Sequence, residues 1–302
     1  MSRVAYVNGR FVRKAEAVVH IEDRGYQFAD AVYEVWALFD GKLGDPDGHF
    51  ARLERSLAEL QITMPMSRQA LTVVLKETVR RNHIREGLAY LQISRGVATR
   101  DHAFPPKGTP PAVVITVSRV DRDAAESRAR KGVAVITTPE NRWGRCDIKT
   151  VGLLPNALAK QKAREVGAVE AWFVDDLGLV TEGTSSNAWI VDGDGNLRTR
   201  DTNANILRGV TRLSLLDVAR KAGFNVEERP FTSDEALSAR EAFITGAGTL
   251  VLPVVLIDGK TVGSGQPGPW RRGFGRSISS MRKQQLSKRQ HAIATVAICG
   301  LA

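Results

Sequence analysis

The chain carries one lysine inside a mostly apolar run, Cys146-Asp147-Ile148-Lys149-Thr150-Val151-Gly152-Leu153-Leu154-Pro155-Asn156. Desolvation disfavours the charged ammonium form of a lysine, and a neutral amine is the nucleophile that condenses with carbonyl groups to form a Schiff base. A surface lysine at the end of a strand is the alternative interpretation of this segment alone, because short patterns match by chance. The rest of the chain decides between the two.

Three further segments could form a binding site with this lysine. Glu182 begins a Gly/Ser/Thr loop within Val180-Thr181-Glu182-Gly183-Thr184-Ser185-Ser186-Asn187. Gly209-Val210-Thr211 opens an expected helix, and backbone N–H groups at a helix N-terminus bind anions. Gly246-Ala247-Gly248 lets the backbone approach a ligand closely, because two of its residues lack a Cβ. Each is weak alone, since glycines often mark plain turns, and the absence of GxxxxGK[ST] and GxGxxG argues against a nucleotide.

Taken together, the chain resembles the fold type IV pyridoxal-phosphate (PLP) enzymes, specifically the D-amino acid aminotransferases, from Tyr6 to about Trp270. Five segments match that family in order and spacing: Tyr33-Glu34-Val35, Arg100-Asp101-His102, Asp147-Ile148-Lys149, Thr181-Glu182-Gly183 and Ile206-Leu207-Arg208-Gly209-Val210-Thr211-Arg212. The resemblance implies an α+β fold class with two α/β domains and the active site between them. The expected parts are a small N-terminal domain (1–120), a larger PLP-binding domain (121–276) and a divergent basic tail (277–302).

The resemblance also implies a role for each residue of the site. Lys149 forms the Schiff base with pyridoxal 5'-phosphate and moves the substrate Cα proton, while Glu182 keeps the pyridine nitrogen protonated so that the ring accepts electrons. The implied phosphate ligands are Arg52, Val210, Thr211, Gly246 and Ala247, with Leu207 packed on the ring and Ser185 near it. Family members often have threonine at the position of Ala247, so one hydroxyl donor is missing. We expect weaker cofactor retention as a result.

Arg100-Asp101-His102 indicates the substrate class. An arginine can hold a carboxylate through two parallel hydrogen bonds, and a histidine two residues on lies on the same face if the segment is extended. In the D-amino acid branch, these two residues and Tyr33 form the trap for the substrate α-carboxylate, with the arginine and histidine reaching in from the partner subunit. The resemblance therefore implies a homodimer that binds an amino acid and a 2-oxo acid. A charged loop before Pro105-Pro106 is the alternative for Arg100 alone.

Length and composition fit this interpretation. A chain of 302 residues with 43% hydrophobic residues can build two domains with real cores. Cys146 and Cys299 lie far apart without metal-ligand spacing, so we expect no disulfide framework and no metal site, and a cytoplasmic location fits. There is no long apolar segment at the N-terminus and no run of eighteen apolar residues, so the sequence predicts neither export nor a membrane span.

The net charge of +10 raises the question of nucleic-acid binding. Seven Lys or Arg residues and no Asp or Glu lie between Gln266 and Ala302, which leaves a net charge of +3 for residues 1–265. Those residues contain no basic stripe interleaved with aromatic side chains, so we expect no nucleic-acid partner and interpret the tail as a solvated surface. Residues 277–302 do not align with the family's acidic and aromatic terminal helix, as a divergent tail or an altered reading frame would produce.

Hydrophobic periodicity predicts the main elements. Ala5-Tyr6-Val7 and Phe11-Val12 flank Asn8-Gly9 as a hairpin. Helices are expected at 47–62, after a Ser67 cap, at 155–165 and at 209–222. Strands are expected at 32–39, 88–95, 112–118, 133–137, 171–174, 188–191 and 243–245. The charged segment Arg119–Asp123 is the expected linker between the domains.

The sequence favours a D-amino acid:2-oxo acid aminotransferase that works by ping-pong half-reactions. D-alanine and 2-oxoglutarate, which would give pyruvate and D-glutamate, are the default pair by resemblance. Three alternatives share the fold: an (R)-selective amine transaminase, a branched-chain aminotransferase and aminodeoxychorismate lyase. Arg100 and His102 argue against them only as far as a carboxylate trap can. A non-catalytic basic binding protein is the alternative from another class, and the concentration of charge in the tail speaks against it.

Overall fold

The computed structural model describes residues 3–202 and 206–268, so the predictions on residues 277–302 and the match near Trp270 lie outside its range. In chain order, the first half contains β1 (Val4–Val7), β2 (Arg10–Arg13), the 3-10 helix η1 (Lys14–Glu16), α1 (Arg24–Phe28), β3 (Ala31–Phe39), β4 (Lys42–Leu43), α2 (Pro46–Glu59), α3 (Arg68–Asn82), β5 (Gly87–Ser94) and β6 (Ala112–Arg119). The second half contains α4 (Arg122–Lys131), β7 (Val133–Pro139), α5 (Leu154–Glu165), β8 (Glu170–Val174), β9 (Val180–Gly183), β10 (Asn187–Val191), β11 (Leu197–Thr199), α6 (Val210–Lys221), β12 (Val226–Glu228), α7 (Ser233–Ser238), β13 (Glu241–Gly246), β14 (Leu250–Ile257) and β15 (Lys260–Thr261).

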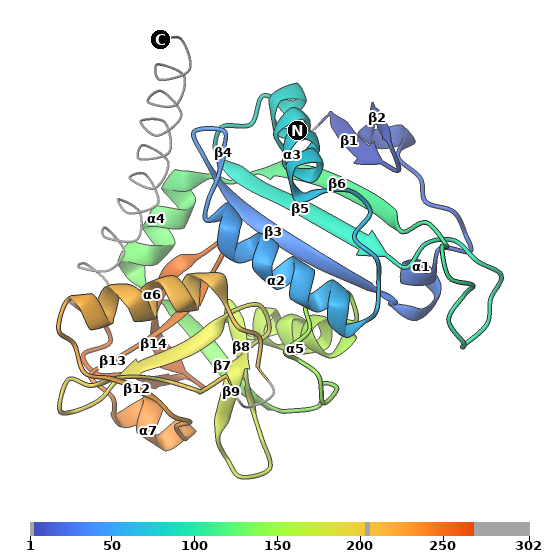
Figure 1. Cartoon of the computed structure of the whole chain (residues 1–302). Coiled ribbons are helices and arrows are strands. Elements are labelled where there is room, and N and C mark those ends of the chain that lie inside the picture. Colours follow the sequence, from blue (N-terminus) through green and yellow to red (C-terminus); the bar gives the residue numbers. More distant parts are fainter. Residues whose placement is uncertain (1–2, 203–205, 269–302) are drawn as a thin grey trace, which may run out of the picture.

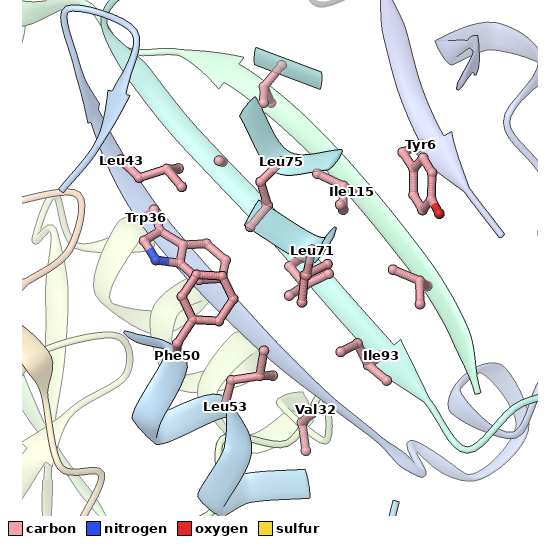
Figure 2. Close-up of a cluster of buried hydrophobic side chains, with 14 of the residues drawn as sticks. Tyr6, Val32, Trp36, Leu43, Phe50, Leu53, Leu71, Leu75, Ile93 and Ile115 are labelled. Atoms are coloured by element: carbon pink, nitrogen blue, oxygen red, sulfur yellow. The ribbon is translucent and has the colours of Figure 1, made fainter. Parts of the chain in front are cut away.

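The first half of the chain forms an antiparallel sheet in the order β2-β1-β6-β5-β3-β4, and α2 and α3 pack on one face (Figure 1). Because successive side chains of a strand point to opposite faces, β3 serves two layers. Val32 and Trp36 enter the core between sheet and helices, where the Trp36 ring lies 5.4 Å from the ring of Phe50 (Figure 2). Tyr33 and Val35 point the other way and line the cavity described below.

The second half forms a mixed sheet in the order β12-β11-β10-β13-β14-β7-β8-β9, with β15 paired to β14. The pairs β14–β7, β7–β8 and β11–β12 are parallel, and the other pairs are antiparallel. Helix α6 packs on this sheet through Leu215 and Leu216, near the stacked rings of Trp189 and Phe243. Two sheets, each covered by helices, confirm the predicted α+β class. None of the described helices is long and apolar enough to cross a membrane.

The structure confirms the predicted hairpin, helices and strands, including the Ser67 cap, whose Oγ accepts a hydrogen bond from the Ala70 N–H. The linker expected at Arg119–Asp123 stays a prediction, and regular elements occupy both of its ends. Strand β6 runs through Arg119 and α4 begins at Arg122, where the Asp121 side chain caps the helix. Helix α4 has no apolar stripe and buries only Ala129 among its residues, so hydrophobic periodicity could not reveal it.

Candidate active site

A cavity of about 320 Å³ is lined by residues from both halves of the chain. Strand β3 and helix α2 contribute from the first half, and β9, the start of α6 and the β13–β14 turn contribute from the second. Ten of the twelve predicted site residues line it: Tyr33, Arg52, Lys149, Glu182, Ser185, Leu207, Val210, Thr211, Gly246 and Ala247. The structure therefore brings segments more than 200 residues apart in sequence into one cavity.

Lys149 is fixed on the strand that carries Tyr33, although the two belong to different halves of the chain. The Tyr33 N–H donates to the Lys149 carbonyl oxygen at 3.0 Å, and Val32 and Thr150 form an isolated β-bridge beside it. The half-buried Lys149 side chain enters the cavity with its Nζ 4.0 Å from the centroid of the Tyr33 ring. The hydrogen bond that holds this segment on β3 uses the Lys149 carbonyl oxygen and does not involve the side-chain amine.

Glu182 lies on β9, a strand that the sequence did not reveal, and its side chain is buried with three donors. Arg142 Nη1 donates to Oε1 at 2.6 Å, Asn187 Nδ2 donates to Oε2 at 3.0 Å, and the Leu207 N–H lies 3.2 Å from Oε1. Burial raises the pKa of the Glu182 carboxyl, and the charge and hydrogen bond of Arg142 oppose that rise. The site thus holds a desolvated acid that is oriented from several sides.

At the start of α6 the cavity has hydrogen-bond donors and partial positive charge, so it can bind an anion there. Gly209 is the N-cap of this 12-residue helix, and Val210 and Thr211 form its first turn. The first N–H groups of a helix have no partner within it, and the helix dipole adds partial positive charge there. The Arg52 guanidinium and the Gly246-Ala247 turn line the same cavity. Such a set can bind a phosphate group.

Arg52 is held by a buried carboxylate that the sequence analysis did not single out. Glu34 accepts from Arg52 Nε at 2.7 Å and from Nη2 at 2.9 Å, and it contacts His49 Nδ1 at 2.7 Å. Burial would raise the pKa of Glu34, but the charge and hydrogen bonds of Arg52, with those of His49, outweigh it and lower this pKa to about 2. Burial lowers the pKa of His49, against the opposing effect of Glu34. Arg52 therefore faces the cavity with two of its donors already engaged by an ionised partner.

Sequence reasoning missed four residues of this site: Glu34, His49, Arg142 and Asn187. A signal existed for two of them, because Glu34 and Asn187 are polar residues within strands whose other positions are apolar, and a buried polar group needs a partner. Arg142 lies in a loop with no periodic pattern, and its partner Glu182 is 40 residues away.

The structure does not bring Arg100 and His102 to the cavity of the same chain. Both are exposed and pack on the ring of Phe28, with the Arg100 guanidinium carbon 5.0 Å and the His102 ring centroid 5.5 Å from its centroid. Of the three predicted residues of the carboxylate trap, only Tyr33 lines the cavity. Within one described chain, the trap is therefore incomplete.

Gly209→Ala is expected to disturb the acid and the anion-binding end together. A Cβ at Gly209 would lie 2.0 Å from Asn187 Oδ1, and the Asn187 amide donates to both Glu182 and the Leu207 carbonyl oxygen. Because Asn187 must move and weaken these bonds, we expect a loss of about 1–3 kcal/mol in unfolding free energy. Denaturant unfolding measures it. Gly193→Ala is the control, since nothing lies within 4 Å of its Cβ, and an equal loss in both variants would contradict the packing argument.

Comparison with known proteins agrees with this geometry. The model of the family "Amino-transferase class IV" matches residues 31–257. A D-alanine aminotransferase of Bacillus licheniformis is 44% identical over 93% of this chain and 98% of its own length, and one of Listeria innocua is 40% identical over 87% and 90%. Among solved structures, the Escherichia coli branched-chain amino acid aminotransferase superposes with a TM-score of 0.86 at 23% identity, covering 93% of this chain and 94% of its own, and thus shows the fold alone. A T.th. branched-chain amino acid aminotransferase, solved with pyridoxamine 5'-phosphate, superposes with a TM-score of 0.84 at 26% identity and the same coverage. By its match to the family model and by its full-length relatives, the chain belongs to the class IV aminotransferases.

Proposed function

We propose that this chain is a PLP-dependent aminotransferase that transfers the amino group of a D-amino acid to a 2-oxo acid. The observation that carries the proposal is the single cavity that joins the Lys149 amine, the buried Glu182 carboxylate and the N-terminus of α6. The D-amino acid class is supported by relatives named D-alanine aminotransferase at 37–44% identity. The branched-chain enzymes among the structural neighbours are less similar, at 23–27% identity, and thus support the alternative less well.

The donors of the cavity fit PLP, which carries a phosphate, a pyridine nitrogen and an aldehyde. The first turn of α6 and Arg52 are suited to the phosphate, Glu182 to the nitrogen and Lys149 to the aldehyde. Leu207 and Ser185 also line the cavity, and Ser185 is fixed by donating to the buried Glu170 carboxylate at 2.9 Å. When bound, PLP supplies an electron sink for the bond that breaks at the substrate Cα.

The residues of the chain provide the proton transfer and hold the ionised groups in place. Lys149 Nζ can take the proton from the substrate Cα and return it, which requires a side chain that can move within the cavity. Arg142, Asn187 and the Leu207 N–H hold the Glu182 carboxylate in one orientation. The buried position of Glu182 keeps water from competing for its oxygens. The donor amino acid and the 2-oxo acceptor bind in turn.

The finer predictions on substrate and assembly belong to the same proposal. D-alanine and 2-oxoglutarate stay the default pair, and Arg100 and His102 are proposed to complete the carboxylate trap of a second copy in a homodimer. Both residues are exposed and do not line the cavity of their own chain, as residues that serve the site of a second copy should be. A cytoplasmic location also stays a prediction.

The absorption spectrum of the purified protein before and after borohydride tests the cofactor and its attachment point. We expect a yellow protein whose visible band disappears on reduction. Borohydride reduces the double bond that links the cofactor to a lysine amine and makes the linkage permanent. Peptide mass analysis should then find pyridoxyl on Lys149. A colourless protein that takes up no added PLP contradicts the proposal.

Initial rates with D-alanine and L-alanine, each with 2-oxoglutarate, test the stereochemistry. We expect turnover of the D-isomer to exceed that of the L-isomer. Faster turnover of L-leucine or L-isoleucine would assign the chain to the branched-chain group instead.

A further inference from the structure

We propose that Arg24 and Phe28 of α1 are positioning residues that hold the segment 100–104, here called the trap loop, in the shape needed to bind a carboxylate. This inference rests on the proposed function, since it assigns the trap loop to substrate binding. It concerns residues that do not line the cavity, and it predicts an effect on substrate affinity that is separate from cofactor binding.

Arg24 holds the backbone of the trap loop. The side chain is 4% exposed, and its Nη1 donates to the carbonyl oxygen of Asp101 at 2.7 Å and to that of Ala103 at 3.2 Å. These two carbonyl groups flank His102. The loop is otherwise exposed and lacks regular secondary structure, so the guanidinium supplies an anchor that the loop's own backbone does not.

Phe28 provides one aromatic surface for both predicted trap residues. The guanidinium carbon of Arg24 lies 4.7 Å from the centroid of the Phe28 ring, and that of Arg100 lies 5.0 Å from it. The His102 ring lies 5.5 Å from the same centroid. Cations are attracted to the faces of aromatic rings, and aromatic rings attract each other at this separation. Arg100 and His102 therefore share one packing surface, which is provided by a residue far from both in sequence.

Asp30 and Arg95 explain why Arg24 stays in place. The Asp30 carboxylate accepts from Arg24 Nε at 2.8 Å and from Arg95 Nε at 2.7 Å. Arg95 also donates to the carbonyl oxygens of Leu60 and Gln61 at the end of α2, and its guanidinium carbon lies 3.6 Å from the Phe104 ring centroid. Two buried arginines thus tie both sides of the trap loop to one carboxylate. Removing these charges from water costs free energy, but their hydrogen bonds hold the two arginine side chains in one geometry.

A fixed trap loop lowers the ordering cost of substrate binding. If the loop were mobile, binding a carboxylate would have to order its backbone and two long side chains, and affinity would fall. Weakening the anchor should therefore raise KM for carboxylate substrates and leave kcat and the bound cofactor nearly unchanged. A residue with a merely structural role would lower stability or cofactor content without this selective change.

Phe28→Leu and Arg24→Lys in the PLP-loaded protein test the inference. Hydrogen exchange of peptides covering residues 98–106 should become faster in both variants, whereas exchange in β3 and α6 should not change. KM for D-alanine should rise about three- to tenfold in each variant, with an unchanged visible band. Phe28→Leu loses the ring contacts, and Arg24→Lys loses hydrogen bonds to the loop carbonyl groups. Phe224→Leu and Arg85→Lys, which make the same changes at residues exposed elsewhere on the surface, are the matched controls. Unchanged exchange in both anchor variants overturns the inference.

A double-mutant cycle shows whether Phe28 acts through Arg100. In the Arg100→Ala background, Phe28→Leu should raise KM less than it does alone, because the contact it supports is already gone. Equal increases in both backgrounds would place the action of Phe28 elsewhere and overturn the inference. The proposed function fails by a different result, the absence of a reducible visible band and of D-alanine turnover in the unmodified protein. The exchange measurement does not depend on that activity.

Discussion

Lys149→Ala is expected to abolish transamination while the fold stays intact. The substitution removes the amine that forms the covalent linkage and moves the Cα proton, so kcat/KM should fall on the order of ten-thousandfold or more. The hydrogen bond that fixes this segment on β3 joins the Tyr33 N–H to the Lys149 carbonyl oxygen, and alanine preserves it. Initial rates with D-alanine and 2-oxoglutarate give the loss, and thermal unfolding checks the fold.

Two further measurements separate chemistry from binding in this variant. Lys76→Ala is the matched control, because Lys76 is an exposed lysine on α3, and it should retain full activity. Added methylamine should restore a small part of the activity of Lys149→Ala, since a free amine can take over the proton transfer. If Lys149→Ala stayed within tenfold of the unmodified protein, the assignment of Lys149 would be wrong, whatever the cofactor content.

The elements of the fold were predictable where composition or spacing is distinctive. Strand β3 is a run rich in β-branched and aromatic residues, and α2 carries Phe50, Leu53 and Leu57 at helical spacing, so both were found from sequence. Helix α4 and strand β9 were not predicted because neither shows a hydrophobic period. Helix α4 has no large apolar residue, and β9 is buried at every position. Their places are set by tertiary contacts rather than by local propensity.

The candidate site divides in the same way. Lys149 and the start of α6 could be proposed because each stands out in its own segment, a lysine among apolar residues and a glycine before a helix. The pairs that orient the site join distant segments, as Arg142 joins Glu182 across 40 residues. No local pattern encodes such a pair, and only the fold brings the two groups together. Arg24 and the trap loop, 77 residues apart, are a further case.

Arg100→Ala should sharply lower activity on D-alanine and leave the cofactor spectrum nearly unchanged. A charge-assisted hydrogen bond contributes about 1.5–3 kcal/mol, so losing a paired set should lower kcat/KM on the order of a hundredfold or more. Arg100 lies outside the cavity of its own chain, which is why the cofactor should be spared. Simple (R)-amines, if they react at all, have no carboxylate and should be spared as well. Initial rates on D-alanine measure the loss.

Mixing Arg100→Ala with Lys149→Ala subunits decides whether the trap crosses a dimer interface. After full exchange of equal amounts, half of the dimers are mixed, and each mixed dimer has one site with an intact lysine and an arginine donated by its partner. Activity should therefore rise from two poor parents to about one quarter of that of the unmodified protein. Mixing Lys149→Ala with an Arg100→Ala/Lys149→Ala double variant is the control and should restore nothing. If the first mixture also restores nothing while subunit exchange is shown by mass, Arg100 serves the cavity of its own chain, and the trap loop must move to reach it.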